Sequence, residues 1–176
     1  MAYQWLLTEG FEPHHLAVAG DSAGGFLATM ATIELRKAEV PPPAAVVALS
    51  PWYDTAVTGE TFETNAGVDV LVGKDVMRMF SQMFRGDVPA DDPGVNVLCA
   101  DPAGLPPVYI VVGAAETLLS DAQRFAAKAE AARVDVRLVV VHEMQHVFPF
   151  MAGRAPEADQ ALADMASWLQ PRLGLS

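Results

Sequence analysis

The sequence has little cysteine: a single residue of this type, Cys99, among 176. One thiol cannot form an intrachain disulfide or a metal site built from several cysteines. No apolar run reaches the roughly 18 residues that a membrane-spanning helix requires. The first residues also lack the charged region and long apolar core of a signal peptide. These absences predict a cytoplasmic protein without a membrane partner.

Positive charge is scarce as well, because 11 lysines and arginines stand against 22 aspartates and glutamates, for a net charge of −11. Such a surface has no electrostatic footprint for nucleic acid or anionic lipid. The 52% of hydrophobic residues argue against disorder. The length suits one domain with a substantial core.

Short runs rich in valine, isoleucine and alanine alternate with segments of helical apolar spacing. Strands are predicted at residues 16–19, 44–49, 108–112 and 136–141. Helices are predicted at residues 2–9, 23–37, about 120–133 and 156–173. Continuous apolar strands that alternate with helices are typical of a parallel sheet covered on both faces. The sequence therefore predicts an α/β fold.

The stretch 54–98 interrupts this alternation. It contains a predicted helix at 74–84, on which Met77, Phe80, Met83 and Phe84 recur at helical spacing. We interpret the stretch as an excursion beside the carboxyl edge of the sheet. Its apolar side chains are expected to pack into the core, with a role in walling a substrate pocket as the alternative.

A Gly-x-Ser-x-Gly motif centred on Ser22 lies between a predicted strand and a predicted helix. This pattern is typical of a nucleophilic serine held on a sharp, strained turn. Gly20 and Gly24 are expected to remove Cβ atoms that would collide across that turn. The N–H of Ala23, at the start of the helix, is predicted to bind the oxygen of a carbonyl under attack.

The pattern has a second interpretation, as a phosphate-binding or purely structural glycine turn. The neighbouring Asp21 and Gly25 complete the motif but do not convert it into Gly-x-Gly-x-x-Gly. Dinucleotide binding of the Rossmann type is therefore disfavoured.

A serine nucleophile needs a base, and the base needs an acceptor that fixes its tautomer. The four histidines are His14, His15, His142 and His146. The first two precede the elbow strand, at its far end from Ser22, and are expected to face solvent. His142 ends the strand 136–141 and is interpreted as a structural or supporting residue. His146 lies in the loop that follows, which is the expected position of the base.

The acid is expected in the loop after the third strand, where two carboxylates occur. Glu116 comes first after the strand and is predicted to orient His146. Asp121 fits a helix N-cap or a first-turn acid better. Both also fit the plain interpretation of solvated surface charges.

The residues Gly20-Asp21-Ser22-Ala23-Gly24-Gly25, Ser50-Pro51-Trp52-x-Asp54 and His146-x-Phe148 resemble segments of the hormone-sensitive-lipase-like carboxylesterases, a bacterial branch of the α/β-hydrolase fold. The resemblance implies hydrolysis of small esters with short to medium acyl chains. It implies Ser22, Glu116 and His146 as the triad, without a metal or organic cofactor. It also implies a pocket lined by Trp52 and Phe148, each of which fits a place in the core equally well.

The sequence departs from the family in two respects. Most members use an aspartate acid within Asp-Pro-Leu-x-Asp, whereas this chain resembles the glutamate variant. Members also have an oxyanion loop, His-Gly-Gly-Gly, and a cap upstream of the nucleophile. Here 21 residues precede Ser22, and none of them forms a Gly-Gly pair.

Residues 1–176 are therefore predicted to be a partial α/β-hydrolase domain, from the nucleophile elbow to the C-terminus. A second copy or an N-terminal segment is expected to complete its sheet. The alternative function is that of an inactive fragment that serves only for self-association.

Overall fold

The computed structural model describes residues 2–175. Its centre is one parallel sheet of four strands in the order β1-β2-β3-β4. The strands are β1 (Ala17–Asp21), β2 (Ala45–Leu49), β3 (Val108–Gly113) and β4 (Val136–Val141). Parallel strands need crossover connections, which here pass over the faces of the sheet. The predicted α/β class with a parallel sheet is confirmed.

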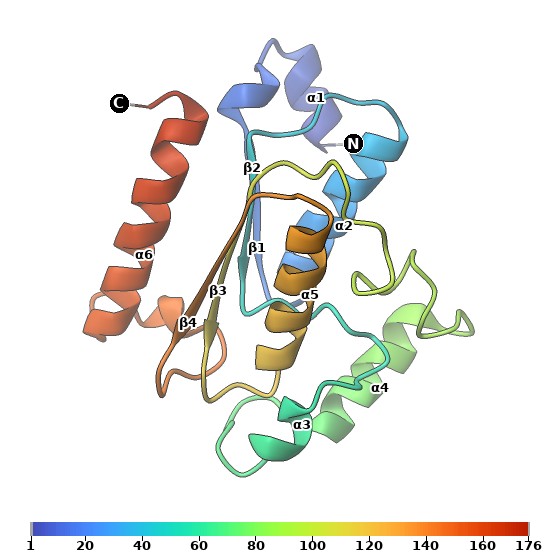
Figure 1. The fold of residues 1–176 in the computed structure, drawn as a ribbon, viewed down its shortest axis with the longest axis vertical. Helices are drawn as coiled ribbons and strands as arrows, with labels where there is room; N and C mark the ends of the chain where they lie inside the picture. The colour runs from blue at the N-terminus through green and yellow to red at the C-terminus, as the bar shows by residue number, and fades with distance from the viewer. Residues whose placement is uncertain (1, 176) are drawn as a thin grey trace.

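Helices cover both faces of the sheet. Figure 1 shows α2 (Ala23–Lys37) and α5 (Leu119–Ala131) on one face and α6 (Pro156–Leu169) on the other. A short helix, α1 (Ala2–Thr8), precedes β1. No helix within residues 2–175 is long and apolar enough to cross a membrane.

The two cores follow from the alternation of side chains along the strands. Val46 and Ile110 point toward α2 and α5, where they pack with residues such as Phe125. Their neighbours point the other way, so that Tyr109 packs against Trp168 of α6. A strand buried on both faces needs apolar residues at every position, which explains the unbroken Val/Ile/Ala runs.

Several element boundaries differ from those predicted. The closing helix was predicted to reach residue 173, but α6 ends at Leu169 and a 3-10 turn, η3 (Gln170–Leu173), follows. Pro171 has no N–H to donate to an α-helical hydrogen bond, which accounts for the change. The first strand extends to Asp21, because its pairing with β2 continues to Leu49.

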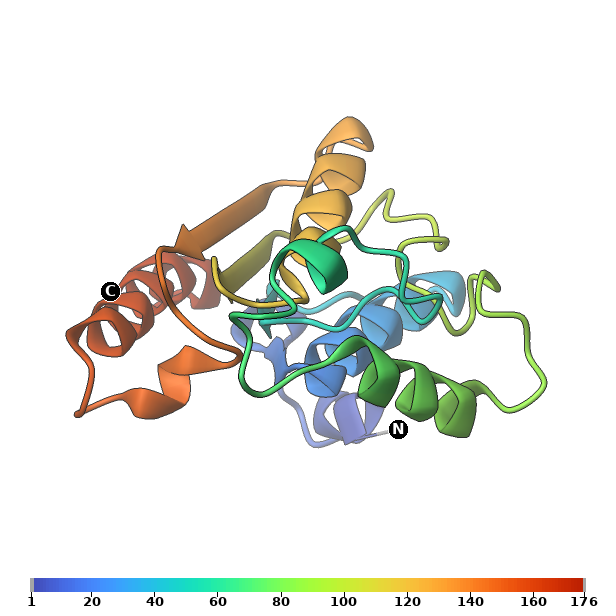
Figure 2. The same cartoon turned by 90° about the horizontal axis from the view of Figure 1, so that it is seen from below.

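The excursion carries α3 (Thr61–Thr64) and α4 (Lys74–Arg85) beyond the carboxyl ends of the strands (Figures 1 and 2). Met77 is buried as predicted. The core interpretation is wrong for Phe80, Met83 and Phe84, which are 46%, 75% and 49% exposed. The helix lies at the margin of the molecule, so only one of its sides meets the rest of the chain.

Ser22 occupies the turn between β1 and α2 in a strained conformation, with φ 51° and ψ −117°. A Cβ on Gly20 would lie 2.2 Å from the carbonyl carbon and oxygen of Gly24. A Cβ on Gly25 would lie 2.9 Å from the side chain of Pro51. At Gly24 the nearest atom is an Asp21 oxygen at 3.8 Å, an ordinary contact. The expected collision therefore exists at Gly20 and does not exist at Gly24.

Asp121 fastens the start of the excursion to α5. Its Oδ2 accepts the backbone N–H groups of Tyr53 and Asp54 at 3.0 and 2.9 Å. The predicted N-cap role is wrong, because α5 begins at Leu119 after Leu118. The alternative, a first-turn acid, is confirmed. The side chain is fully buried, which contradicts the interpretation as a solvated surface charge.

Two buried carboxylates, those of Asp54 and Asp121, lie together here. Their pKa values are shifted in opposite directions. Burial, with a smaller contribution from the neighbouring Asp54 charge, raises the pKa of Asp121 to about 7. Burial also raises the pKa of Asp54, but hydrogen bonds from Thr58, Asn96 and Arg124 outweigh it and lower that pKa below its usual value. Within residues 2–175, the Asp121 Oδ1 atom has no hydrogen-bond partner.

We predict that Asp121→Asn removes a pH-dependent loss of stability. Because folding raises the pKa of Asp121, the folded chain keeps a proton that the unfolded chain has released. The free energy of unfolding attributable to this group is thus greatest below pH 4 and falls as pH rises through 7. Urea denaturation from pH 4 to 8 should show wild type losing up to roughly 4 kcal/mol relative to the variant.

The lowered pKa of Asp54 acts with the opposite sign, since its contribution is lost as pH falls. Because the Asp54 charge also raises the pKa of Asp121, the two titrations are coupled, and the difference between the proteins reports Asp121 together with this coupling. A difference that stays constant across the pH range would contradict the prediction.

We also predict different outcomes for alanine at the two elbow glycines. Gly20→Ala places a methyl group against helix backbone that cannot retreat, and should lower the free energy of unfolding by about 3 kcal/mol or more. Gly24→Ala meets no close atom and should leave it unchanged or raise it by up to about 1 kcal/mol. Urea unfolding followed by circular dichroism compares them. Equal losses would show that the motif does not depend on this close approach.

Candidate active site

Ser22, Glu116 and His146 meet at the carboxyl edge of the sheet, each in the loop after a different strand. The His146 Nε2 atom lies 3.0 Å from the Ser22 Oγ atom. The His146 Nδ1 atom lies 3.0 Å from the Glu116 Oε2 atom. Because the carboxyl ends of parallel strands share one edge, residues 124 positions apart reach hydrogen-bonding distance.

Burial increases from the serine to the carboxylate. Ser22 is partly exposed, the His146 side chain is 12% exposed, and Glu116 is fully buried. The interpretation of Glu116 as a solvated surface charge is therefore wrong. With its proton on Nδ1, the imidazole donates to the carboxylate and leaves Nε2 to accept the serine hydroxyl. The arrangement is chemically able to deprotonate Ser22.

Ser50, which follows β2 at the same edge, makes two further contacts. Its hydroxyl donates to the Glu116 Oε1 atom at 2.6 Å and accepts the N–H of Val147 at 3.0 Å. The N–H of Gly113 also donates to that Oε1 atom, at 2.6 Å. The sequence reasoning gave Ser50 no role, although a polar residue directly after a buried strand was a usable signal.

Ala23 begins α2, as predicted, and is exposed to solvent. The first N–H groups of a helix have no intrahelical acceptor, so this N–H is free to bind an anion beside Ser22. The Ser22 carbonyl oxygen accepts N–H groups from Gly25, Phe26 and Trp52, which holds the turn in place.

The other histidines lie away from this site. His14 and His15 are exposed, as expected. His142 was interpreted as structural or supporting, but its side chain is 88% exposed and its nearest charged partner is Glu143 at 4.0 Å. The interpretation is wrong, because the residue leaves the end of an edge strand toward solvent.

Trp52 and Phe148 are both buried in apolar clusters. Trp52 packs with Phe62 and Leu118 and donates its indole N–H to the Asp54 carbonyl at 3.0 Å. Phe148 belongs to the cluster beneath α6. The structure thus places both in the core, the second of the two roles considered for them.

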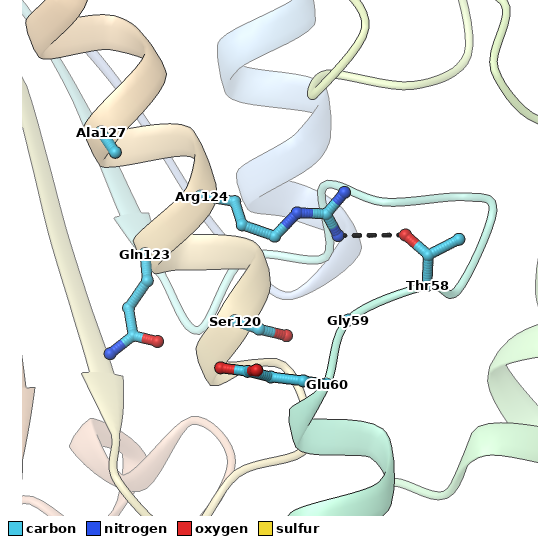
Figure 3. Close-up of a pocket in the computed structure, with 7 residues that line it drawn as sticks. All are labelled: Thr58, Gly59, Glu60, Ser120, Gln123, Arg124 and Ala127. Carbon is cyan, nitrogen blue, oxygen red and sulfur yellow. Dashed lines mark hydrogen bonds between the residues drawn. The ribbon is translucent and has the colours of Figure 1, made fainter.

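A cleft of about 480 Å³ opens between α5 and the loop before α3 (Figure 3). Its walls are Thr58, Gly59, Glu60, Ser120, Gln123, Arg124 and Ala127. The Arg124 guanidinium that crosses it is already bound to Asp54 and Thr58, at 2.9 and 3.1 Å. None of the three residues that meet at the sheet edge lines this cleft.

Within the described part of the chain, one group of potential metal ligands gathers. Glu12, His14 and His15 bring one ligand atom each within 4.8 Å of the others, and all three are exposed. They precede β1, at the end of the sheet opposite Ser22. The Nδ1 atom of His15 is hydrogen-bonded to the Leu173 carbonyl at 2.7 Å. This group has no contact with the candidate active site.

Comparison with known proteins matches residues 1–150 to a family described as the alpha/beta hydrolase fold. The chain is 34% identical over 167 residues to an esterase of Acinetobacter venetianus, covering 94% of this chain and 55% of that protein. It is 33% identical to an acetyl-hydrolase of Streptomyces hygroscopicus, covering 98% of this chain and 58% of that protein. The chain thus spans about half the length of the curated relatives it matches.

The structure also superposes closely on solved structures. An esterase from the bacterial hormone-sensitive lipase family superposes with a TM-score of 0.96 at 42% identity. The match covers 98% of this chain and 58% of that one. A further structure, of EstE5, has a TM-score of 0.95 at 34% identity, with the same coverage. The chain belongs to the α/β-hydrolases, and among them to the hormone-sensitive-lipase-like carboxylesterases.

Proposed function

We propose that residues 1–176 are part of an α/β-hydrolase domain that hydrolyses carboxylic esters through an acyl-enzyme on Ser22. The observation that carries the proposal is the continuous hydrogen-bonded path from Ser22 through His146 to Glu116, with 3.0 Å at each step. Nucleophile, base and orienting acid in this geometry are the components of acyl transfer.

In the proposed mechanism, His146 Nε2 takes the Ser22 proton as Oγ bonds to the acyl carbon. The carbonyl electron pair moves to oxygen and gives a tetrahedral intermediate. Collapse of that intermediate expels the alcohol, which receives the proton from His146. Water then repeats the sequence on the acyl-enzyme, releases the acid and restores Ser22. Glu116 accepts the hydrogen bond from the His146 Nδ1 atom and stabilises the imidazolium.

The oxyanion is proposed to bind the N–H of Ala23, at the positive end of α2. Loss of one such donor costs roughly 2.7–4 kcal/mol of transition-state stabilisation. The relatives that this chain matches are longer, since it covers 55% and 58% of the first two. We propose that further donors come from polypeptide outside residues 1–176.

The proposed substrates are small esters with short to medium acyl chains. Names of relatives, an esterase and an acetyl-hydrolase, support this class. The partly exposed Phe84 is a suitable apolar wall, because its ring stands 5.3 Å from that of Phe26, four residues after Ser22. The centroid of the Trp52 ring lies 6.4 Å from that of Phe84, and Trp52 is proposed to pack behind this wall, on its core side.

A second candidate function is self-association without catalysis. Two observations favour it: among the described residues β1 pairs with β2 on one side only, and Met83 and Phe84 leave apolar surface on α4. An open strand edge and exposed apolar side chains each favour pairing with more polypeptide, and we propose a second copy of this chain.

We predict that the chain hydrolyses a short-chain p-nitrophenyl ester and that Ser22→Ala lowers kcat by about 10⁴ to 10⁶. The loss is expected because, among residues 2–175, Ser22 is the hydroxyl that lies against the His146 Nε2 atom. Ser167→Ala is the matched control, since this serine is exposed on α6 and bonds only to the Ala163 carbonyl. Release of p-nitrophenol is followed by absorbance.

Equal rates for wild type and Ser22→Ala would remove Ser22 from the mechanism. Light scattering on the same samples then separates the two candidates. A folded dimer with Ser22-independent rates would favour self-association, whereas a monomer would contradict it.

A further inference from the structure

Ser50 is a fully buried serine between β2 and Pro51, in a left-handed backbone conformation with φ 47°. A serine in this conformation is strained, so the surrounding contacts must hold it there. It lies between the loops that carry Glu116 and His146, and it contacts both.

The direction of its hydrogen bonds is fixed. Val147 contributes an N–H, which can only donate, so the Ser50 oxygen accepts at 3.0 Å. A serine hydroxyl has one proton, and the acceptor 2.6 Å away is the Glu116 Oε1 atom. Ser50 therefore donates to the acid while it accepts from the residue next to the base.

The two oxygens of the Glu116 carboxylate have different hydrogen-bond partners. Its Oε1 atom receives the Ser50 hydroxyl and the Gly113 N–H, each at 2.6 Å. Its Oε2 atom faces the His146 Nδ1 atom at 3.0 Å. A glutamate has one more rotatable bond than an aspartate, and two donors on one oxygen fix the direction of the other oxygen.

The loop that carries His146 also needs a contact that fixes its conformation. Val147 is left-handed, with φ 53°, although its side chain is β-branched. The only side-chain acceptor of its N–H in the described chain is Ser50. Loss of that acceptor would leave a buried N–H unpaired and allow the loop to turn His146 away from Ser22.

We propose that Ser50 is a positioning residue. Its one hydroxyl holds the Glu116 carboxylate and the loop of His146 in the orientation that lets the two side chains form their hydrogen bond. The effect of Ser50 on turnover rests on the proposed function. The effect of Ser50 on the tautomer of the His146 imidazole does not. A purely structural serine would affect stability alone. A positioning serine also sets which His146 nitrogen carries the proton.

The test uses Ser50→Ala and Ser50→Gly in the chain of residues 1–176. The glycine variant accepts φ 47° without strain, so it removes the hydroxyl while easing the backbone. Ser81→Ala is the matched control, because Ser81 is also buried and bonds only to the Thr55 carbonyl, in the excursion. Nitrogen-15 NMR of His146 reports the tautomer, and p-nitrophenyl ester kinetics report kcat and KM.

We expect the Nδ1–H tautomer of His146 to predominate in wild type and to lose that predominance in both Ser50 variants. We expect kcat to fall about 10- to 100-fold with KM unchanged, as for loss of a hydrogen bond to a charged group. Ser81→Ala should lower thermal stability and leave tautomer and kcat unchanged. Wild-type tautomer and kcat in both Ser50 variants would overturn the proposal.

Two further outcomes keep the proposals distinct. A tautomer change in the Ser50 variants, in a chain with no Ser22-dependent turnover, supports Ser50 as a positioning residue and counts against the hydrolase. If neither variant folds, hydrogen exchange of the wild-type Val147 amide decides. Slow exchange supports its bond to Ser50, and exchange at the rate of an open loop overturns it.

Discussion

The hydrogen bond between the His146 imidazole and the buried Glu116 carboxylate is the interaction on which the site depends. Glu116 is fully buried, and a charge in that position is costly unless it is paired and hydrogen-bonded. Ser50, Gly113 and His146 together supply those bonds. The same contacts that make the buried charge tolerable also aim the imidazole at Ser22.

The sheet brings the functional residues to one edge, and contacts between the loops fix their orientation. The parallel strands bring the ends of β1, β2, β3 and β4 to one edge, and each contributes a polar residue there. Buried carboxylates then fasten the loops: Glu116 holds the base, and Asp121 holds the chain after β2. Asp121 keeps one unpaired oxygen within the described chain, which is consistent with its raised pKa.

Much of this could be predicted from the sequence, because the strong signals are local. Apolar runs located the strands, and the Gly20–Gly25 motif located the elbow. Contacts made at a distance could not be predicted. Phe80 and Phe84 have core-like spacing, yet exposure depends on where α4 lies. Ser50 faces the acid only because β2 and β3 are neighbours, which no local pattern states.

The central claim is that His146 activates Ser22 where the two side chains meet. Covalent labelling by a fluorophosphonate, followed by intact mass and peptide mapping, tests it most directly. The account predicts one adduct, on Ser22, formed at least about 10³-fold more slowly in folded His146→Gln, because the variant lacks a general base. An adduct on another residue, or equal labelling rates in the two proteins, would contradict it.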